Sequence, residues 1–134
     1  MELSPPNDLS RLNDLSYLII ECGIEVHRAL GPGLLESTYR KCMVFELGER
    51  GLTVLMEQIV PVRYKTLILD GGYRLDLIVN GAIVVELKAV ETVLPVHRQQ
   101  LLTYLKHTDK PLGLLINFNV DLLTKGVIRI RNGF

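Results

Sequence analysis

Charged side chains interrupt two apolar, strand-like segments in the middle of the chain. Asp76 lies within the segment 73–79, and Glu86 and Lys88 lie within 82–88. A charge in a buried strand is costly unless it is paired or bound to a metal ion. Two carboxylates offer hard oxygen ligands to Mg²⁺ or Mn²⁺, and a nearby lysine can orient water or stabilise negative charge on a phosphate. These residue types therefore suit metal-assisted hydrolysis of a phosphodiester.

The same charges have a purely structural interpretation. Asp76 or Glu86 could form a buried ion pair with Arg74 or Lys88 and have no other role. Ion-pair networks also perturb pKa values, and in that respect they imitate active sites. From these residues alone, both interpretations stay open.

The geometry of the charges depends on the turn between the two strands. Side chains alternate along a strand, so Glu86 and Lys88 share a face. A two-residue loop at 80–81 would pair 76 with 85 and place Asp76 on the face opposite Glu86. A three-residue loop at 79–81, with Gly81 in a left-handed bulge, would pair 78 with 82 and 76 with 84. We predict the bulged loop, because it alone brings Asp76 to the face of Glu86.

Hydrophobic periodicity predicts the elements that must position these charges. A loose leader over 1–12 is followed by a cap at Asn13 or Asp14 and a helix that ends at Gly31. The other predicted elements are a helix over 34–50, a long strand over 54–64 bent near Pro61, strands over 73–79 and 82–88, a helix over 96–107, and strands over 112–118 and 127–131. The order is helix, helix, three antiparallel strands, helix, strand and strand. We therefore predict a single mixed α/β domain over residues 13–134.

Composition limits the classes of protein to which the chain can belong. Hydrophobic residues make up 48% of its 134 residues, which argues for a folded core and against a disordered or fibrous chain. The 15 basic and 15 acidic side chains cancel, which excludes a histone-like polycation. Residues 1–62 carry 5 Lys/Arg and 9 Asp/Glu, whereas 63–134 carry 10 and 6. We therefore expect an anionic partner to meet the second half of the chain.

The two cysteines and the first residues of the chain indicate the cellular compartment in which the protein is expected. Cys22 and Cys42 have no CxxC spacing and are expected to be reduced thiols. The first residues are polar and acidic, and the apolar runs of the chain are short, so neither a signal peptide nor a membrane span is expected. These observations predict a cytoplasmic protein that has no membrane partner.

The spacing of the central charges resembles a known signature. Asp76 and the triplet Glu86-Leu87-Lys88, with nine residues between them, are similar to the Asp…Glu-x-Lys signature of the PD-(D/E)xK nuclease superfamily, with Leu75 in place of the proline. The residues 33–39, GLLESTY, resemble the motif that names the GxxExxY proteins, small bacterial and archaeal chains placed in that superfamily. The likeness runs from about residue 20 to the C terminus. It implies a restriction-endonuclease-like core, flanked by an extra N-terminal helix.

The resemblance implies roles for the residues of the signature. Asp76 and Glu86 would be metal ligands, with the backbone carbonyl of Leu87 as a third ligand. Lys88 would be the catalytic lysine. The cofactor implied is Mg²⁺ or Mn²⁺.

Residues on two helices would complete the implied site. Glu36 would direct its carboxylate at the metal-bound water or at a second ion, although a carboxylate in a first helical turn also interacts favourably with the helix dipole. Gln100 and Tyr104 are similar to the Gln-x-x-x-Tyr pair of exonuclease-type branches, and at i and i+4 of a helix they share a face. Tyr39 and His27 are expected to be structural residues, Tyr39 as a packed ring with a tethered hydroxyl.

The function that follows is hydrolysis of nucleic acid, with DNA favoured over RNA, by a metal-activated water. One alternative is an inactive nuclease-fold module that binds nucleic acid or protein, because the superfamily also contains inactive members. Another is a dimeric, junction-resolving endonuclease, so a homodimer stays open. The basic residues that could form a nucleic-acid surface are Lys65, Arg98, Lys106, Lys110, Lys125, Arg129 and Arg131. No aromatic residues interleave with them to indicate base stacking.

Overall fold

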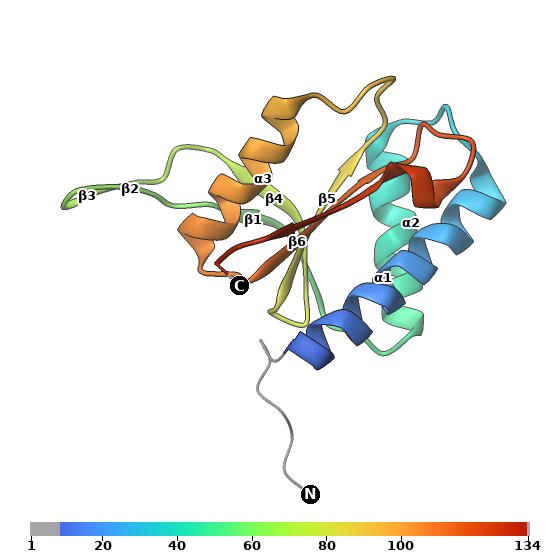
Figure 1. Cartoon of the computed structure of the whole chain (residues 1–134), viewed down its shortest axis with the longest axis horizontal. Coiled ribbons are helices and arrows are strands. Elements are labelled where there is room, and N and C mark those ends of the chain that lie inside the picture. Colours follow the sequence, from blue (N-terminus) through green and yellow to red (C-terminus); the bar gives the residue numbers. More distant parts are fainter. Residues whose placement is uncertain (1–8, 134) are drawn as a thin grey trace, which may run out of the picture.

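The computed structural model describes residues 9–133, in which a central five-stranded sheet has helices on both faces (Figure 1). The elements in chain order are α1 (Leu9–Leu30), α2 (Glu36–Glu49), β1 (Val54–Ile59), β2 (Val62–Tyr64), β3 (Leu67–Leu69), β4 (Arg74–Val79), β5 (Ile83–Lys88), α3 (Pro95–Thr108), β6 (Leu112–Asn117), the 3₁₀ helix η1 (Leu123–Gly126) and β7 (Val127–Arg131). No helix in this part of the chain is long and apolar enough to cross a membrane.

The sheet is mixed, as the order of elements predicts. Its strand order is β1-β4-β5-β6-β7, with β5 and β6 parallel and the other neighbours antiparallel. The parallel pair requires a crossover connection, which α3 provides. The last strand, β7, lies at one edge of the sheet.

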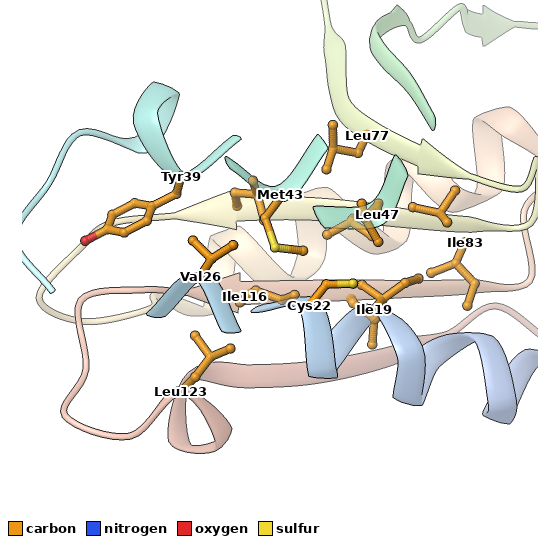
Figure 2. Packing of buried hydrophobic residues seen from close by; sticks show 14 of the residues in the cluster. Ile19, Cys22, Val26, Tyr39, Met43, Leu47, Leu77, Ile83, Ile116 and Leu123 are labelled. Carbon is orange, nitrogen blue, oxygen red and sulfur yellow. The ribbon is translucent and has the colours of Figure 1, made fainter. Parts of the chain in front are cut away.

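Two apolar clusters lie on the two faces of the sheet. The larger cluster packs α1 and α2 against the sheet through residues such as Ile19, Met43 and Leu77, all fully buried (Figure 2). The smaller cluster packs α3 against the other face, where Leu101 and Leu105 meet Val84. Burial of both faces explains why the strands of the sheet centre are almost continuously apolar.

The first helix begins earlier than its apolar stripe predicts. It starts at Leu9, so the predicted cap at Asn13 or Asp14 is wrong, and the predicted leader over 1–12 overlaps the first turn of α1. Leu12 is fully buried in the larger cluster, which gives this turn a packing partner that periodicity alone does not reveal. Residues 1–8 of that leader lie outside the described residues.

The long strand predicted over 54–64 is two strands. Strand β1 ends at Ile59, before Pro61, and the chain then forms the separate β2–β3 hairpin, which the sequence analysis does not predict. Lys65 takes a positive φ of 55° in the tight turn of this hairpin. The hairpin extends away from the main sheet, past the side of α3 (Figure 1).

The turn between β4 and β5 differs in register from the predicted bulged loop. Val79 pairs with Ile83 and Ile78 with Val84, so the predicted pairing of 78 with 82 and 76 with 84 is wrong. Asn80 and Gly81 both have left-handed backbone, and the amide of Ala82 donates to the carbonyl of Val79. Because the register moves by two residues, this change by itself moves no side chain to the other face of the sheet. The last pair of this register is Leu77 with Val85, so the next residues, Asp76 and Glu86, lie across from each other.

Candidate functional site

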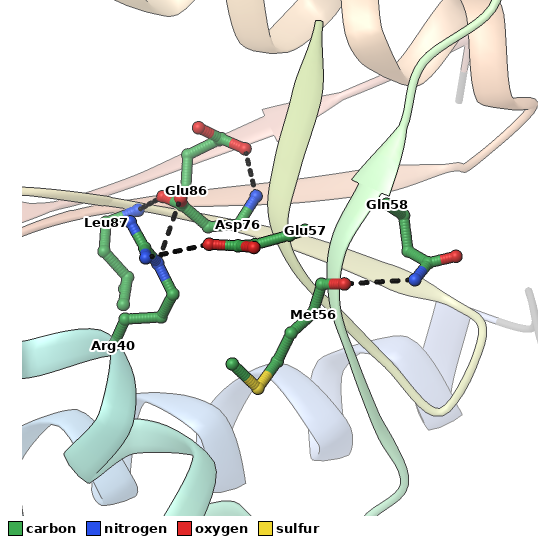
Figure 3. Close-up of polar contacts among 7 residues, drawn as sticks. All are labelled: Arg40, Met56, Glu57, Gln58, Asp76, Glu86 and Leu87. Carbon is green, nitrogen blue, oxygen red and sulfur yellow. Dashed lines mark hydrogen bonds and ion pairs between the residues drawn. The ribbon is translucent and has the colours of Figure 1, made fainter. Parts of the chain in front are cut away.

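The strands β4 and β5 part at Asp76 and Glu86, where side chains replace the backbone ladder. The amide of Asp76 donates to Glu86 Oε1 at 3.0 Å, and the amide of Leu87 donates to Asp76 Oδ2 at 2.8 Å (Figure 3). Each carboxylate is thus held by a backbone N–H of the opposite strand. A strand residue directs its N–H and C=O to the same neighbouring strand, so the carbonyl of Leu87 also faces β4.

The pairing of β1 with β4 is interrupted at the same level of the sheet. Met56 pairs with Leu77 and Gln58 with Leu75, while the register skips Glu57 and Asp76. Glu57 has a positive φ of 51°, which is strained backbone for a residue with a Cβ. Leu75 and Leu77 pack in different clusters, although strand alternation would place them on one face. The local distortion of both strands therefore sets the orientation of Asp76.

Burial and the negative charge of Asp76 raise the pKa of two carboxylates of the site, Glu86 and Glu36. Burial, followed by the negative charge of Asp76, raises the pKa of Glu86 to about 8, against the opposing effects of the Asp76 amide and Lys88. Burial and then Asp76 also raise the pKa of Glu36, while Lys88 and Arg40 oppose this shift. The site thus contains more buried negative charge than its neighbouring cations neutralise.

Helix α2 contributes Glu36 and an arginine that the sequence analysis does not single out. Glu36 is the first residue of the helix, and Arg40 lies one turn later on the same face. Arg40 forms ion pairs with Asp76, at 3.4 Å, and with Glu57, at 3.3 Å (Figure 3). The i+4 spacing from Glu36 was a signal that could have identified Arg40. No signal marked Glu57, because its role depends on the distortion of β1.

Helix α3 brings Gln100 and Tyr104 to the other side of the acidic residues. Tyr104 is largely buried. Its burial, followed by the negative charge of Glu86, raises the pKa of its hydroxyl. The exposed side chain of Gln100 opposes this rise in the pKa of Tyr104.

The oxygen atoms of the site are of the kind that a hard divalent cation prefers, although they do not converge on a single point in this structure. Within residues 9–133, no three Asp, Glu, His or Cys side chains are grouped closely enough to hold a metal ion. The carboxylates of Asp76 and Glu86 each use one oxygen for a backbone amide. A divalent cation would relieve the repulsion that raises the pKa of Glu86, so the chemistry of the donors fits Mg²⁺ or Mn²⁺.

Two conspicuous polar residues outside the site have structural contacts, as predicted. The hydroxyl of Tyr39 donates to the carbonyl of Gly31 at 2.6 Å, and its ring stacks on Phe118 at a centroid distance of 4.4 Å. His27 Nε2 contacts the carbonyl oxygen of Val120 at 2.8 Å. These contacts attach the loop before α2 and the loop after β6 to the core.

The basic residues proposed as a nucleic-acid surface are engaged in different ways. Lys125 pairs with Asp121, Lys110 donates to the carbonyl of Gly81, and Arg129 donates to Asn13. Lys106, by contrast, is exposed on α3. The set therefore does not act as one uniform basic face.

The fold and the site together define a class of protein, in which a mixed sheet between helices carries one buried carboxylate, one half-buried carboxylate and a lysine on adjacent strands. The chain belongs to the PD-(D/E)XK nuclease superfamily, whose sequence profile matches residues 13–130. A search of curated proteins and a search of solved structures each found no match. Superfamily membership indicates a metal-dependent nuclease that acts on nucleic acid, and such nucleases typically use divalent metal ions.

Proposed function

We propose that this protein hydrolyses phosphodiester bonds of nucleic acid with a metal-activated water. The observation that carries the proposal is the reciprocal bonding of Asp76 and Glu86 to each other's strands, with Glu36 and Lys88 in electrostatic reach. In a member of the PD-(D/E)XK superfamily, this arrangement supports a hydrolytic site.

Each residue of the site has a chemical role in the proposal. Asp76, Glu86 and the carbonyl of Leu87 would hold Mg²⁺ or Mn²⁺, with Glu36 completing the set of oxygen ligands. When bound, the cation polarises the phosphate and lowers the pKa of a water molecule. Lys88 would donate to a phosphate oxygen and stabilise the negative charge that develops there.

Gln100 and Tyr104 would act on the α3 side of the site. The two side chains lie one helical turn apart, and both line the same groove. The Tyr104 hydroxyl would then orient a phosphate oxygen or the attacking water. Orientation of a reacting group lowers the barrier because the entropy of alignment has been lost before the reaction.

Cleavage assays with matched variants test the proposed reaction. Labelled single-stranded and duplex DNA and RNA are incubated with Mg²⁺ or Mn²⁺ and resolved on gels. Glu86→Gln and Lys88→Met are expected to reduce the rate by about 100-fold or more, since the first weakens a metal ligand and the second removes the positive charge beside the phosphate. Glu49→Gln makes the same exchange at an exposed position at the end of α2 and should cleave like the parent. Equal cleavage by all four proteins would refute the assignment.

A second candidate function is an inactive module that keeps the nuclease fold for binding. The ion pair between Arg40 and Asp76 favours it, because a guanidinium already neutralises one proposed ligand. Calorimetric titration of Mn²⁺ into the parent and into Glu86→Ala separates the two functions. Binding that disappears in the variant supports the enzyme, whereas no binding, even with a non-cleavable oligonucleotide present, supports the module.

Finer assignments belong to the same proposal. The segment 33–39 supports membership of the GxxExxY group, and we further propose DNA as the preferred substrate, a single domain over 13–134 and a cytoplasmic location. The free thiols of Cys22 and Cys42 are compatible with a reducing compartment. Light scattering tests for a homodimer, and cleavage of branched DNA tests the junction-resolving alternative.

A further inference from the structure

A groove of about 380 Å³ lies beside the candidate site, between the base of the β2–β3 hairpin and α3. The residues that matter for its chemistry are Val60, Val62, Tyr73, Val96, Gln100 and His107. Tyr104 also lines the groove, and it packs in the smaller apolar cluster with Leu75, the neighbour of Asp76, and Val84, two residues before Glu86. No carboxylate lines the groove. It therefore offers apolar walls with amide and imidazole groups, a combination typical of small-ligand sites.

Tyr73 presents an aromatic ring to this groove. Its side chain is 49% exposed, and its ring lies 6.3 Å from the ring of Tyr104 at an angle of 51°. The carbonyl of Tyr73 accepts the amide of Val60 at 2.8 Å, which fixes the backbone that carries the ring. A Cβ atom on Gly71 would lie 3.3 Å from the ring, so the bare backbone of Gly71 lets the ring lie close against it. The ring is held in place, yet much of its surface is accessible.

A second groove, of about 370 Å³, continues from the first. His107 lines both grooves, and the second also contains Arg63 and Lys106, together with Asp109. Neither Arg63 nor Lys106 forms an ion pair with another described residue. The surface thus changes from acidic residues to an apolar, aromatic groove and then to two cations. With the proposed divalent cation on the acidic residues, this order suits a strand that has one phosphate at each end of the surface and a base between them.

We infer that the groove on Tyr73 binds an unpaired nucleobase of the substrate strand next to the scissile phosphate. Apolar walls and a tyrosine ring suit the two faces of a base, while Gln100 and His107 suit its polar edge. Arg63 and Lys106 would bind the phosphate of the following nucleotide. Bases of an intact duplex are stacked on each other and have no free face to offer, so the inference names single-stranded or unpaired nucleic acid as the substrate class. It rests on the proposed nuclease function.

Fluorescence of 2-aminopurine tests whether a base stacks in the groove. Short DNA and RNA strands with one central 2-aminopurine are titrated with the full chain in Ca²⁺, both single-stranded and as duplexes. Binding of a single strand by the parent should quench the fluorescence, whereas a duplex should bind more weakly. Tyr73→Leu keeps the apolar bulk but removes the ring, so it should lose the quenching and weaken binding by about tenfold or more.

Matched variants show whether the effect belongs to the groove. Tyr64→Leu makes the same exchange at a tyrosine of the hairpin that is 61% exposed and does not line the groove, and it should bind like the parent. Arg63→Gln and Lys106→Gln should weaken binding without removing the quenching, and they should lower its salt dependence. Lys41→Gln, at an exposed position of α2 that lines neither groove, is their control.

Three results would overturn the inference. The first is a Tyr73→Leu protein that quenches and binds like the parent, and the second is a parent that binds none of the strands. The third is a dimer, seen by light scattering, that Tyr73→Leu dissociates, because the groove would then hold a second copy of the chain. Failure of the nuclease proposal is detected separately, by cleavage and Mn²⁺ titration of Glu86→Gln.

Discussion

Glu86 and Asp76 place two carboxylates on neighbouring strands in a largely buried position. The hydrogen bonds from the amides of Asp76 and Leu87 hold these groups in position. Their proximity has a cost, because burial and the charge of Asp76 make ionisation of Glu86 unfavourable and raise its pKa to about 8. A site that binds a cation through such groups therefore reduces the stability of the cation-free protein.

Glu86→Gln is expected to stabilise the cation-free protein in a pH-dependent way. The pKa of Glu86 is higher in the folded chain, about 8, than the ordinary value of 4.5, so the folded state retains the proton between these values. The stability of the parent consequently falls as the pH rises from about 4.5 to about 8, and the uncharged glutamine escapes this loss. In EDTA, the melting temperature of the variant should exceed that of the parent by at least about 3 °C near pH 8, with little difference near pH 4.5.

Circular dichroism melts from about pH 4.5 to about pH 9 measure this difference. Glu49→Gln, an exposed exchange of the same kind, should follow the parent at every pH. A difference for Glu86→Gln that is constant across the range would contradict the proposed cause.

Arg40 is expected to stabilise the protein most when no divalent cation is bound. Its ion pairs with Asp76 and Glu57 are partly shielded from water, with side-chain exposures of 20% for Arg40 and 13% for Asp76. Arg40→Met should lower the free energy of unfolding in EDTA by about 1–3 kcal/mol, because it leaves Asp76 without its cationic partner. Denaturant unfolding with and without Mn²⁺ measures the effect, and added Mn²⁺ should stabilise this variant more than the parent.

Arg28→Met provides the comparison for Arg40. Its ion pair with Glu25 is on the surface, with side-chain exposures of 71% and 52%, so its loss should change stability by less than about 0.5 kcal/mol. Equal effects of the two substitutions would show that Arg40 has no special place at the site.

At the scale of elements, one close backbone contact positions the last part of the chain. Gly126 ends η1 immediately before β7, and a Cβ atom there would overlap the carbonyl oxygen of Asn117 at the end of β6. The side chain of Asn117 bonds to both backbone groups of Val90, in the segment that follows Lys88. The contact at Gly126 is thus connected to the strand that carries the site.

Gly126→Ala is expected to destabilise the fold strongly. The overlap is with backbone, which cannot rotate away as a side chain can, so we expect a loss of about 2–4 kcal/mol in the free energy of unfolding. Gly48→Ala, within α2, meets no atom within 4 Å and should instead stabilise the protein by about 0.5–1 kcal/mol. Urea unfolding of both variants checks the prediction, which fails if the two changes have the same sign.

At the scale of the whole molecule, the two apolar clusters share one sheet. The helices α1 and α2 pack on one face and α3 on the other, while β4, β5 and β6 contribute residues to both clusters (Figure 1). Neither cluster can lose its packing while the shared strands stay intact. The site lies on these strands, so its geometry depends on both layers of helices.

The shared sheet predicts one cooperative unfolding transition. Far-ultraviolet dichroism, which follows helices and sheet, and tyrosine fluorescence, which follows Tyr39 and Tyr104 among others, should give the same midpoint in urea. Two separated midpoints would show that the layers unfold independently, and would contradict the single domain proposed over residues 13–134.

Residue types and their spacing were enough to predict the elements whose apolar residues recur with a strong period, and the order of these elements. They also predicted that Asp76, Glu86 and Lys88 interrupt apolar strands, since this follows from residue type and alternation alone. These are local properties, and the shift of two residues in the β4–β5 register left them unchanged because the period of a strand is two.

Only the tertiary structure decided the contacts of Arg40 and the groove on Tyr73. Arg40 meets Asp76 because α2 packs on the sheet where β1 and β4 are distorted, and Tyr73 faces α3 because the chain leaves the sheet near Pro61 to form the hairpin. Such contacts join residues far apart in the sequence and depend on the packing of whole elements. Periodicity in the sequence reports only on residues that are close along the chain, so it cannot predict such contacts. For this reason the central charges of the site could be predicted from the sequence, whereas the residues around them are known only from the fold.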